Sequence, residues 1–218
     1  MKWIAIVLLL ALAACERTAG ATSAPAASAA EAAVAATTAV AATTAVAAPP
    51  PDSAPSSDME AALGRFRQMI GHAPLRLGGA AASSRAALVE RFIRAVETAD
   101  TAAFATMMIS RAEFAWLYYP HTNYMRPPYE MDPAVLWTLQ VQNAEKGINR
   151  TLREYGGKPL GLAGHRCAAE PATAGPNRVW QDCVIDLDFD GETVTLRLFG
   201  SILERDGRFK FMSYANNL

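Results

Sequence analysis

The chain has 218 residues, of which 51% are hydrophobic, and a formal net charge of −1 at pH 7. Of its 20 basic and 21 acidic residues, 2 and 3 precede Asp58, which leaves 18 of each sign in the remainder. A neutral domain without a basic stripe is a poor candidate for nucleic-acid binding, so we expect no nucleic-acid partner. The length leaves room for one domain beside the unusual N-terminal part.

The chain begins with a segment typical of secretion signals. Residues 1–2 supply a basic start, and residues 4–14 form an apolar run that is too short to span a bilayer. The run closes on Leu12-Ala13-Ala14-Cys15, which resembles the lipobox of bacterial lipoproteins. The resemblance implies that residues 1–14 are a signal peptide and that Cys15 is lipidated and becomes the first mature residue. The alternative is an ordinary cleaved signal in which this cysteine is incidental.

A lipidated Cys15 would anchor the chain to a membrane. Its acyl chains, palmitate among them, exceed the two signals that stable anchoring needs. The next residue is Glu16 rather than aspartate, which by the same resemblance favours the periplasmic face of the outer membrane. We therefore expect a cell-envelope protein whose first partner is the membrane itself.

Residues 15–57 combine this cysteine with a stretch built mainly from Ala, Thr, Ser and Pro. The hexamer Val-Ala-Ala-Thr-Thr-Ala occurs twice in succession, from Val34 and from Val40, and three prolines follow at positions 49–51. The stretch has no aromatic residue and cannot bury enough surface to offset its ordering entropy. We predict a disordered linker with a reach of about 35 Å, which holds a domain at residues 58–218 away from the membrane.

The domain opens with helical patterns. Asp58 is the expected N-cap of a first helix, and a second helix is expected over residues 84–99. Asp100 can cap a short third helix. Ser110 and Glu113 fit the capping box of another, in which each residue satisfies a backbone N–H of the other.

A long helix is expected over residues 133–155, because Asp132 can act as N-cap before a proline at the first helical position. Glycines at positions 156 and 157 stop it. Its inward stripe is predicted to be Leu136, Leu139, Ala144, Ile148, Leu152 and Tyr155.

From Leu160 the hydrophobic period changes to two, which predicts β-strands. The expected strands are residues 160–169, 178–189, 192–204 and 208–215. Asp-Gly dipeptides at 190–191 and 206–207 are typical of two-residue hairpins, so the last three strands should form an antiparallel meander.

The hairpin turns also predict the register, with Phe189 opposite Glu192 and Arg205 opposite Arg208. One face of the sheet is then apolar and needs helices to cover it: Cys183, Ile185, Leu187, Val194, Leu196, Leu198, Ile202 and Phe211. The other face is polar: Asp182, Asp186, Asp188, Thr193, Thr195 and Arg197. Its carboxylates resemble paired catalytic acids, but we prefer a solvated sheet surface with Arg197 between Asp182 and Asp186.

The order of these elements, with a long helix before strands that end in a meander, resembles the NTF2-like superfamily over about residues 84–218. The resemblance implies an α+β fold in which a curved antiparallel sheet wraps around the N-terminal helices as a cone. Ketosteroid isomerases, limonene-epoxide hydrolases, polyketide cyclases and non-catalytic transport or secretion domains share this fold, so it does not assign a function. Catalytic relatives line the cone with acids, bases or tyrosines. Here the corresponding sheet positions are aliphatic apart from Ser213 and Phe209.

Two cysteines remain once Cys15 is assigned to the lipobox. Cys167 and Cys183 are an even pair in an exported chain, which favours a disulfide. If the two residues are directly opposed, the turn between them falls at Gly175, within a strong turn signal. A zinc site of His165 with both cysteines is the rival, but no fourth ligand lies nearby, and we expect no metal and no cofactor.

The stretch from Glu113 to Glu130 is the densest candidate for a binding site. Aromatic rings beside a single His and a single Arg can line a ligand pocket. The candidate residues are Trp116, Tyr118, Tyr119, His121, Tyr124, Arg126 and Tyr129. His121 as a general base would need an orienting acid, for which Glu113 is the nearest choice. The alternative is a proline-shaped loop that its aromatic residues pin to the core.

These features favour a membrane-anchored periplasmic lipoprotein whose domain binds a small hydrophobic ligand or an envelope protein without catalysis. The first alternative is an isomerase, dehydratase or hydrolase of the NTF2-like type that uses the loop of residues 113–130. The second is a structural component of an envelope or secretion complex. The sequence shows no nucleophile motif, phosphate-binding loop or metal-ligand spacing outside the candidates above.

Overall fold

A computed structural model describes residues 54–189 and 191–218 of the chain. The chain divides into two units between residues 46 and 47, and the described residues belong to the second unit. The predicted signal peptide, the predicted lipidation site Cys15 and most of the predicted linker lie outside the described residues. In the described part, no helix has the length and apolar character needed to cross a membrane.

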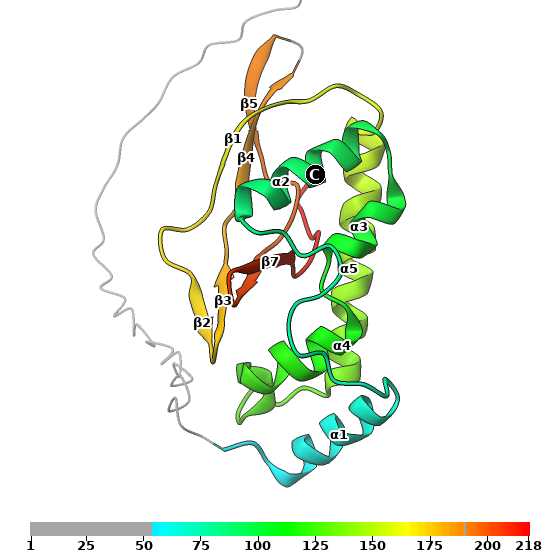
Figure 1. The fold of residues 1–218 in the computed structure, drawn as a ribbon, viewed down its shortest axis with the longest axis vertical. Coiled ribbons are helices and arrows are strands. Elements are labelled where there is room, and N and C mark those ends of the chain that lie inside the picture. Colours follow the sequence, from blue (N-terminus) through cyan, green and yellow to red (C-terminus); the bar gives the residue numbers. More distant parts are fainter. Residues whose placement is uncertain (1–53, 190) are drawn as a thin grey trace, which may run out of the picture. The chain divides into compact units, whose positions relative to one another are not determined.

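The described part is an α+β structure in which helices precede strands along the chain (Figure 1). The helical elements are α1 (Ser57–Gln68), α2 (Arg85–Glu97), α3 (Thr101–Met107), α4 (Arg111–Glu113), the π-helix η1 (Phe114–Tyr118), the 3₁₀ turns η2 (Tyr119–His121) and η3 (Asn123–Met125), and α5 (Pro133–Tyr155). The strands are β1 (Gly161–Arg166), β2 (Ala172–Ala174), β3 (Asn177–Trp180), β4 (Val184–Phe189), β5 (Glu192–Leu196), β6 (Ile202–Arg205) and β7 (Arg208–Phe211).

Side-chain caps begin the helices. The predicted cap of α1 at Asp58 is wrong by two residues: Ser56 is the N-cap and accepts a hydrogen bond from the backbone N–H of Met59. The reason is that a hydroxyl at Ser56 reaches that N–H, while Asp58 already lies in the first turn, where its charge favours the helix dipole. The capping box that begins α4 at Ser110 is confirmed.

The strands form two antiparallel sheets, in the orders β1-β4-β5 and β2-β3-β6-β7. The expected single meander is therefore wrong. The expected strand 178–189 breaks at residues 181–183, where Asp182 has a φ of +51°, and the strand 192–204 breaks at residues 197–201. A short strand, β2, that the sequence did not predict completes the second sheet. Both predicted hairpin registers are confirmed, at Phe189 with Glu192 and at Arg205 with Arg208.

Two hydrophobic clusters lie on opposite sides of the second sheet. Ile202 and Leu203 are neighbours on β6 and both fully buried, but they belong to different clusters because side chains alternate across a strand. The first cluster packs α2 and α3 on the sheets, with the ring of Phe92 5.4–5.8 Å from four other aromatic rings. The second packs α1 and η1 on the far side. The predicted apolar face is confirmed, but around β6 and β7 the opposite face is buried as well.

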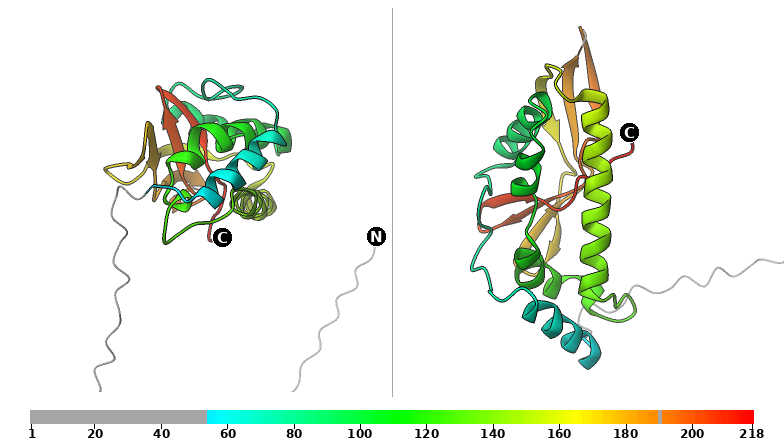
Figure 2. Two further views of the ribbon diagram at one scale, coloured as in Figure 1. Left: turned by 90° about the horizontal axis from the view of Figure 1, so that it is seen from below. Right: turned by 90° about the vertical axis from the view of Figure 1, so that its right-hand side faces the viewer.

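Helix α5 runs along one side of this part, α2 and α3 lie along the other, and α1 lies at one end near α5 (Figure 2, right). Its predicted inward stripe is only partly right. Leu139 is 44% exposed, and the residues that α5 buries fully are Pro133, Ala144, Gly147 and Thr151, three of them small. Gly147 and Thr151 are buried because the C-terminal segment approaches α5 closely. Asn216 donates hydrogen bonds to the Gly147 carbonyl (2.9 Å) and to the Thr151 hydroxyl (3.0 Å).

Candidate functional site

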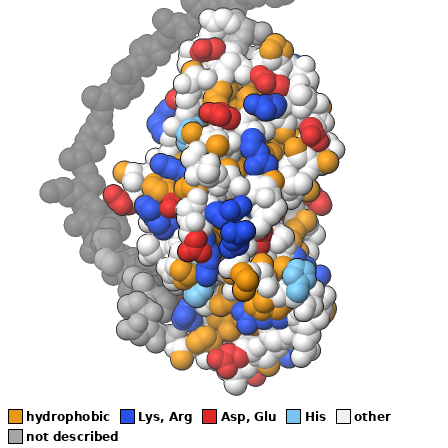
Figure 3. Space-filling model, in the orientation of Figure 1, with side chains coloured by type: hydrophobic (Ala, Val, Ile, Leu, Met, Phe, Trp, Pro, Cys, Tyr) orange, Lys and Arg blue, Asp and Glu red, His pale blue; other side chains and the backbone are white. Residues whose placement is uncertain are grey.

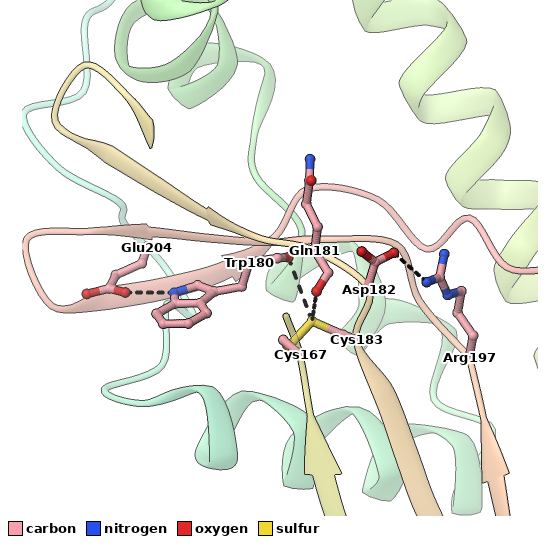
Figure 4. Close-up of a disulfide and its surroundings, with 7 residues drawn as sticks. All are labelled: Cys167, Trp180, Gln181, Asp182, Cys183, Arg197 and Glu204. Carbon is pink, nitrogen blue, oxygen red and sulfur yellow. Dashed lines mark hydrogen bonds and ion pairs between the residues drawn. A yellow bond between two sulfur atoms is a disulfide. The ribbon is translucent and has the colours of Figure 1, made fainter. Parts of the chain in front are cut away.

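The predicted disulfide joins Cys167 to Cys183, with an S–S distance of 2.02 Å (Figure 4). β1 and β4 pair with Arg166 opposite Val184, so the next pair outward in the same register is the two cysteines. Because the sulfur atoms are bonded to each other, the zinc alternative with His165 is wrong. Within residues 54–189 and 191–218, no group of three or more His, Cys, Asp and Glu side chains could hold a metal ion.

The acidic face of the first sheet is a network of exposed ion pairs and hydrogen bonds. Arg166 lies 2.6 Å from Asp186, and Arg197 lies 2.7 Å from Asp182. The arrangement with Arg197 between the two carboxylates is therefore wrong, because Arg166 on the neighbouring strand reaches Asp186 instead. Hydrogen bonds from Thr195 and Arg166 lower the pKa of Asp186. A general acid needs a raised pKa, so these contacts support a solvated sheet surface rather than a catalytic pair.

Charges of both signs are interspersed on the face shown in Figure 3. The ion pairs lie mostly at the surface, as Arg166–Asp186 does with side-chain exposures of 60% and 27%. Lys210 and Glu113 are the exception among the described pairs, at 2.9 Å and 5% and 4% exposed. The charges of this domain therefore organise local contacts rather than one field of a single sign.

The aromatic stretch after the capping box folds as three successive short turns, η1, η2 and η3. Phe114 and Tyr119 point into the core and are fully buried. The Tyr119 hydroxyl donates a hydrogen bond to the Met131 carbonyl at 2.5 Å, and burial is the main cause that raises its pKa. Tyr119 therefore holds the loop to the start of α5, as the alternative interpretation of the loop expects.

Other side chains of the same loop face a cavity of about 280 Å³. From the loop come Tyr118, His121, Tyr124 and Tyr129, and from the β2–β3 hairpin and the residue after β3 come Thr173, Val179 and Gln181, among others. We call this cavity the tyrosine pocket. Four of the seven predicted binding residues line it, brought to the hairpin by a fold that the sequence pattern did not show.

The other three predicted binding residues lie elsewhere. Trp116 packs under the guanidinium of Arg67, 5.4 Å from its ring centre. Arg126 donates a hydrogen bond to the Thr122 carbonyl at 3.3 Å, and Tyr119 is the buried residue described above. In helical turns successive side chains point in different directions, so one short segment cannot direct all seven toward one cavity.

His121 lies against the hairpin turn, since a Cβ atom at Gly175 would lie 2.5 Å from the His121 Nδ1 atom. Burial lowers the pKa of His121, and the charges of Arg205 and Arg126 lower it further. Glu113, the nearest candidate for an acid that orients His121, has other partners. Glu113 is buried and accepts hydrogen bonds from Ser110, Gly78 and Lys210. In the described part of the chain, no carboxylate forms a hydrogen bond with His121, so the histidine has no orienting acid.

A second cavity, of about 460 Å³, lies between α3 and α5. We call it the apolar groove. Its surface is mainly apolar, from side chains such as Phe104, Met108, Trp137, Val141 and Ile148. The sequence did not predict this groove, although it placed one lining residue, Ile148, with five other residues in the inward stripe of α5. Their apolar spacing reports burial but not whether the space between two helices is filled.

Comparison with models of known protein families, with curated proteins and with solved structures finds no match. The choice between the tyrosine pocket and the apolar groove as the functional site therefore rests on the chemistry of their lining residues. The tyrosine pocket offers hydroxyls, amides and a histidine beside aromatic rings. The apolar groove offers hydrocarbon and aromatic surface with polar groups such as Ser110 and Asn149 among its lining.

Proposed function

We propose that this chain is a lipoprotein anchored through Cys15 at the periplasmic face of the outer membrane, whose domain binds a ligand without catalysis. The domain is of the NTF2-like type, a proposal that rests on the order of its helices and on its antiparallel strands after a long helix. The observation that carries the binding function is the tyrosine pocket. Three tyrosines and His121 line this cavity. In the described part of the chain, His121 forms no hydrogen bond with a carboxylate.

The enzyme alternative finds less support. A general base in this pocket needs a partner that orients it and a pKa suited to proton transfer. The acid chosen for that role, Glu113, is held by a lysine and two backbone N–H groups. The pocket suits recognition, in which rings and neutral polar groups bind a ligand without moving its protons.

The binding proposal is tested by native mass spectrometry of the detergent-extracted, full-length protein. We expect a co-purified or added ligand whose occupancy falls in the double variant Tyr124→Ala/Tyr129→Ala. Both side chains are 40–45% exposed, so their removal should leave folding intact. Leu139→Ala, an exposed apolar change on α5, is the control. Equal ligand occupancy in the wild type and the double variant would contradict the proposal.

The apolar groove supports a second candidate function, the binding of a small hydrophobic ligand. Its volume and apolar lining suit a ligand with little polar surface. Val141→Trp should fill the groove and abolish binding there, while leaving the tyrosine pocket unchanged. If only Val141→Trp removes a bound ligand, the groove is the functional site and the tyrosine pocket is not.

The anchor is tested separately by fractionation. Cys15→Ala should release the chain from membranes, because the apolar run of residues 4–14 is too short to span a bilayer without the lipid. Cys15→Ser gives the same loss of the thiol with a different side chain. If either variant still sediments with membranes after a high-salt wash, lipidation at Cys15 is not the anchor.

A further inference from the structure

The lining of the tyrosine pocket is electrically neutral. Its polar groups come from tyrosines, threonines, amides and one histidine, and none of its lining residues is Lys, Arg, Asp or Glu. Burial lowers the pKa of His121, and the charges of Arg205 and Arg126 lower it further, which favours the uncharged imidazole. A charged ligand would find no counter-ion in the lining, and burial without one is costly. The pocket therefore suits a neutral ligand.

Several polar side chains of the pocket are also unused within the protein, although the Thr122 hydroxyl donates a hydrogen bond to the Tyr119 carbonyl. Among the described residues, no intramolecular hydrogen bond engages the side chains of Asn123, Thr173 or Gln181, or the hydroxyls of Tyr124 and Tyr129. These groups supply both donors and acceptors. A ligand that fits them must carry several hydroxyl or amide groups of its own.

Aromatic rings lie beside these polar groups. Tyr118, Tyr124 and Tyr129 present rings that combine an apolar face with a polar end. A pyranose ring has the matching character, since its C–H groups form an apolar face and its hydroxyls lie around the edge. A purely aliphatic ligand would leave the hydroxyls and amides unpaired, which costs binding free energy. The apolar groove would accept such a ligand better.

The hairpin side of the pocket adds a patch of small apolar surface. Ala172, Ala174 and Val179 form it, and the amide of Gln181 also lines the pocket. A methyl group packed on the alanines and an amide next to it would satisfy both features. The acetamido group of an amino sugar carries this pair, a methyl attached to an amide. The cavity of about 280 Å³ has room for one sugar residue with this substituent.

We propose that the tyrosine pocket binds an N-acetylated hexosamine residue of a glycan, with only uncharged groups of the sugar inside the pocket. The inference rests on the proposed function, because it names the ligand class of the same pocket. The sugar stacks on the tyrosine rings, its hydroxyls pair with Asn123 and Thr173, and its acetamido group pairs with Gln181 and packs on Ala172.

The test is isothermal titration calorimetry of the full-length protein in detergent. The probes are tetra-N-acetylchitotetraose and cellotetraose, which have the same linkage and differ at the acetamido position. We expect the acetylated probe to bind more tightly, and Tyr124→Ala or Tyr129→Ala to weaken it at least about tenfold. Gln181→Ala should reduce the preference between the two probes. Leu139→Ala should bind as the wild type does.

The inference would be overturned if neither probe binds, or if both probes bind equally. The native mass spectrometry described above separates these failures from that of the proposed function. A ligand that depends on Tyr124 and Tyr129 while neither sugar binds leaves the binding function standing and removes the amino sugar. Binding of the acetylated probe that survives both tyrosine substitutions contradicts both proposals.

A second arm distinguishes the source of the amino sugar. N-acetylated hexosamines occur both in chitin-type oligosaccharides and in cell-wall peptidoglycan. Sedimentation of the protein with insoluble chitin and with purified peptidoglycan sacculi should show retention on at least one. Retention on sacculi alone assigns the cell-wall glycan, and retention on chitin alone assigns the free oligosaccharide. Retention on neither solid overturns the inference.

Discussion

Gly147 shows how one residue in the middle of a helix can serve the tertiary structure. Glycine normally weakens a helix interior by about 0.5–1 kcal/mol relative to alanine. Here a Cβ atom would collide with the backbone carbonyl of Tyr214, because the C-terminal segment crosses α5 at this point. The missing side chain is what lets Asn216 bond to the helix backbone. A local weakness of α5 therefore makes room for a long-range contact.

Replacing this glycine should destabilise the domain. Gly147→Ala is expected to lower the free energy of unfolding by about 1–3 kcal/mol, the usual cost of overpacking. Gly64→Ala on α1 is the matched control, since no atom lies within 4 Å of its added Cβ and it should stabilise by about 0.5–1 kcal/mol. Urea unfolding followed by circular dichroism measures both. A gain of stability in both variants would contradict the close approach.

Glu113 and Lys210 form a buried ion pair 97 residues apart in sequence, with an O–N distance of 2.9 Å. The backbone N–H groups of Gly78 and Ser110 donate to the same carboxylate, each at 2.6 Å. One side chain thus caps α4, holds the loop before α2 and neutralises a lysine on β7. The Glu113 carboxylate is tolerated in the interior because its oxygens accept hydrogen bonds from Gly78, Ser110 and Lys210.

Breaking this pair should cost far more than breaking an exposed one. Lys210→Met leaves the Glu113 carboxylate buried without its cation and should cost about 3–5 kcal/mol. Arg166→Met, at an exposed pair, should cost less than about 1 kcal/mol. The double variant Glu113→Gln/Lys210→Met should lose less than the sum of the single variants. Additive losses in urea unfolding would show that the two side chains do not interact.

Among the elements, β1 and β4 are joined by the disulfide just beyond the end of their pairing. β1 is short, contains two glycines and has no fully buried residue, so side-chain burial contributes little to holding it on the sheet. Cys167 and Cys183 close the open end of its pairing with β4 and are 16 residues apart in sequence. The break at residues 181–183 separates β3 from β4 and includes the bridged Cys183. β3 belongs to one sheet and β4 to the other.

Removing the bridge should destabilise this junction. Cys167→Ala/Cys183→Ala is expected to lower the free energy of unfolding by about 3 kcal/mol, from the entropy of the loop that it closes. The wild type in reducing agent should unfold at the same urea concentration as the double variant. A midpoint identical to that of the oxidised wild type would mean that the bridge adds no stability.

At the scale of the whole chain, both hydrophobic clusters are built from residues between Met59 and Tyr214. The cap of the first helix, Ser56, also belongs to the described part. The sequence of residues 16–53 carries no core-forming pattern, so we predict that the described part folds without them.

This independence is measured by comparing three chains in urea. The chain of residues 54–218 should have the same midpoint as that of residues 16–218. A chain that begins at Met59 lacks Ser56 and should lose about 0.5–2 kcal/mol, the usual value of an N-cap. A lower midpoint for residues 54–218 would show that the N-terminal part packs on the domain.

The sequence alone determined those features that depend on neighbouring residues. Hydrophobic period predicted the main helices and every strand segment except β2, although it joined β3 to β4 and β5 to β6. The Asp-Gly turns predicted both hairpin registers, and the turn before Pro176 led to the pairing of Cys167 with Cys183. These signals are local because backbone conformation at a cap or turn depends on a few adjacent side chains. The aromatic loop was recognised for the same reason, as a cluster within a short stretch.

The tertiary structure alone decided which of these residues meet across the fold. It divided one expected meander into two sheets, buried both faces around β6 and β7, and turned Glu113 toward Lys210 rather than toward His121. It also selected four of seven loop residues for the tyrosine pocket and opened the apolar groove between two helices. Each outcome depends on packing between segments far apart in sequence, and a pattern of polarity along the chain specifies which residues are buried but not their partners.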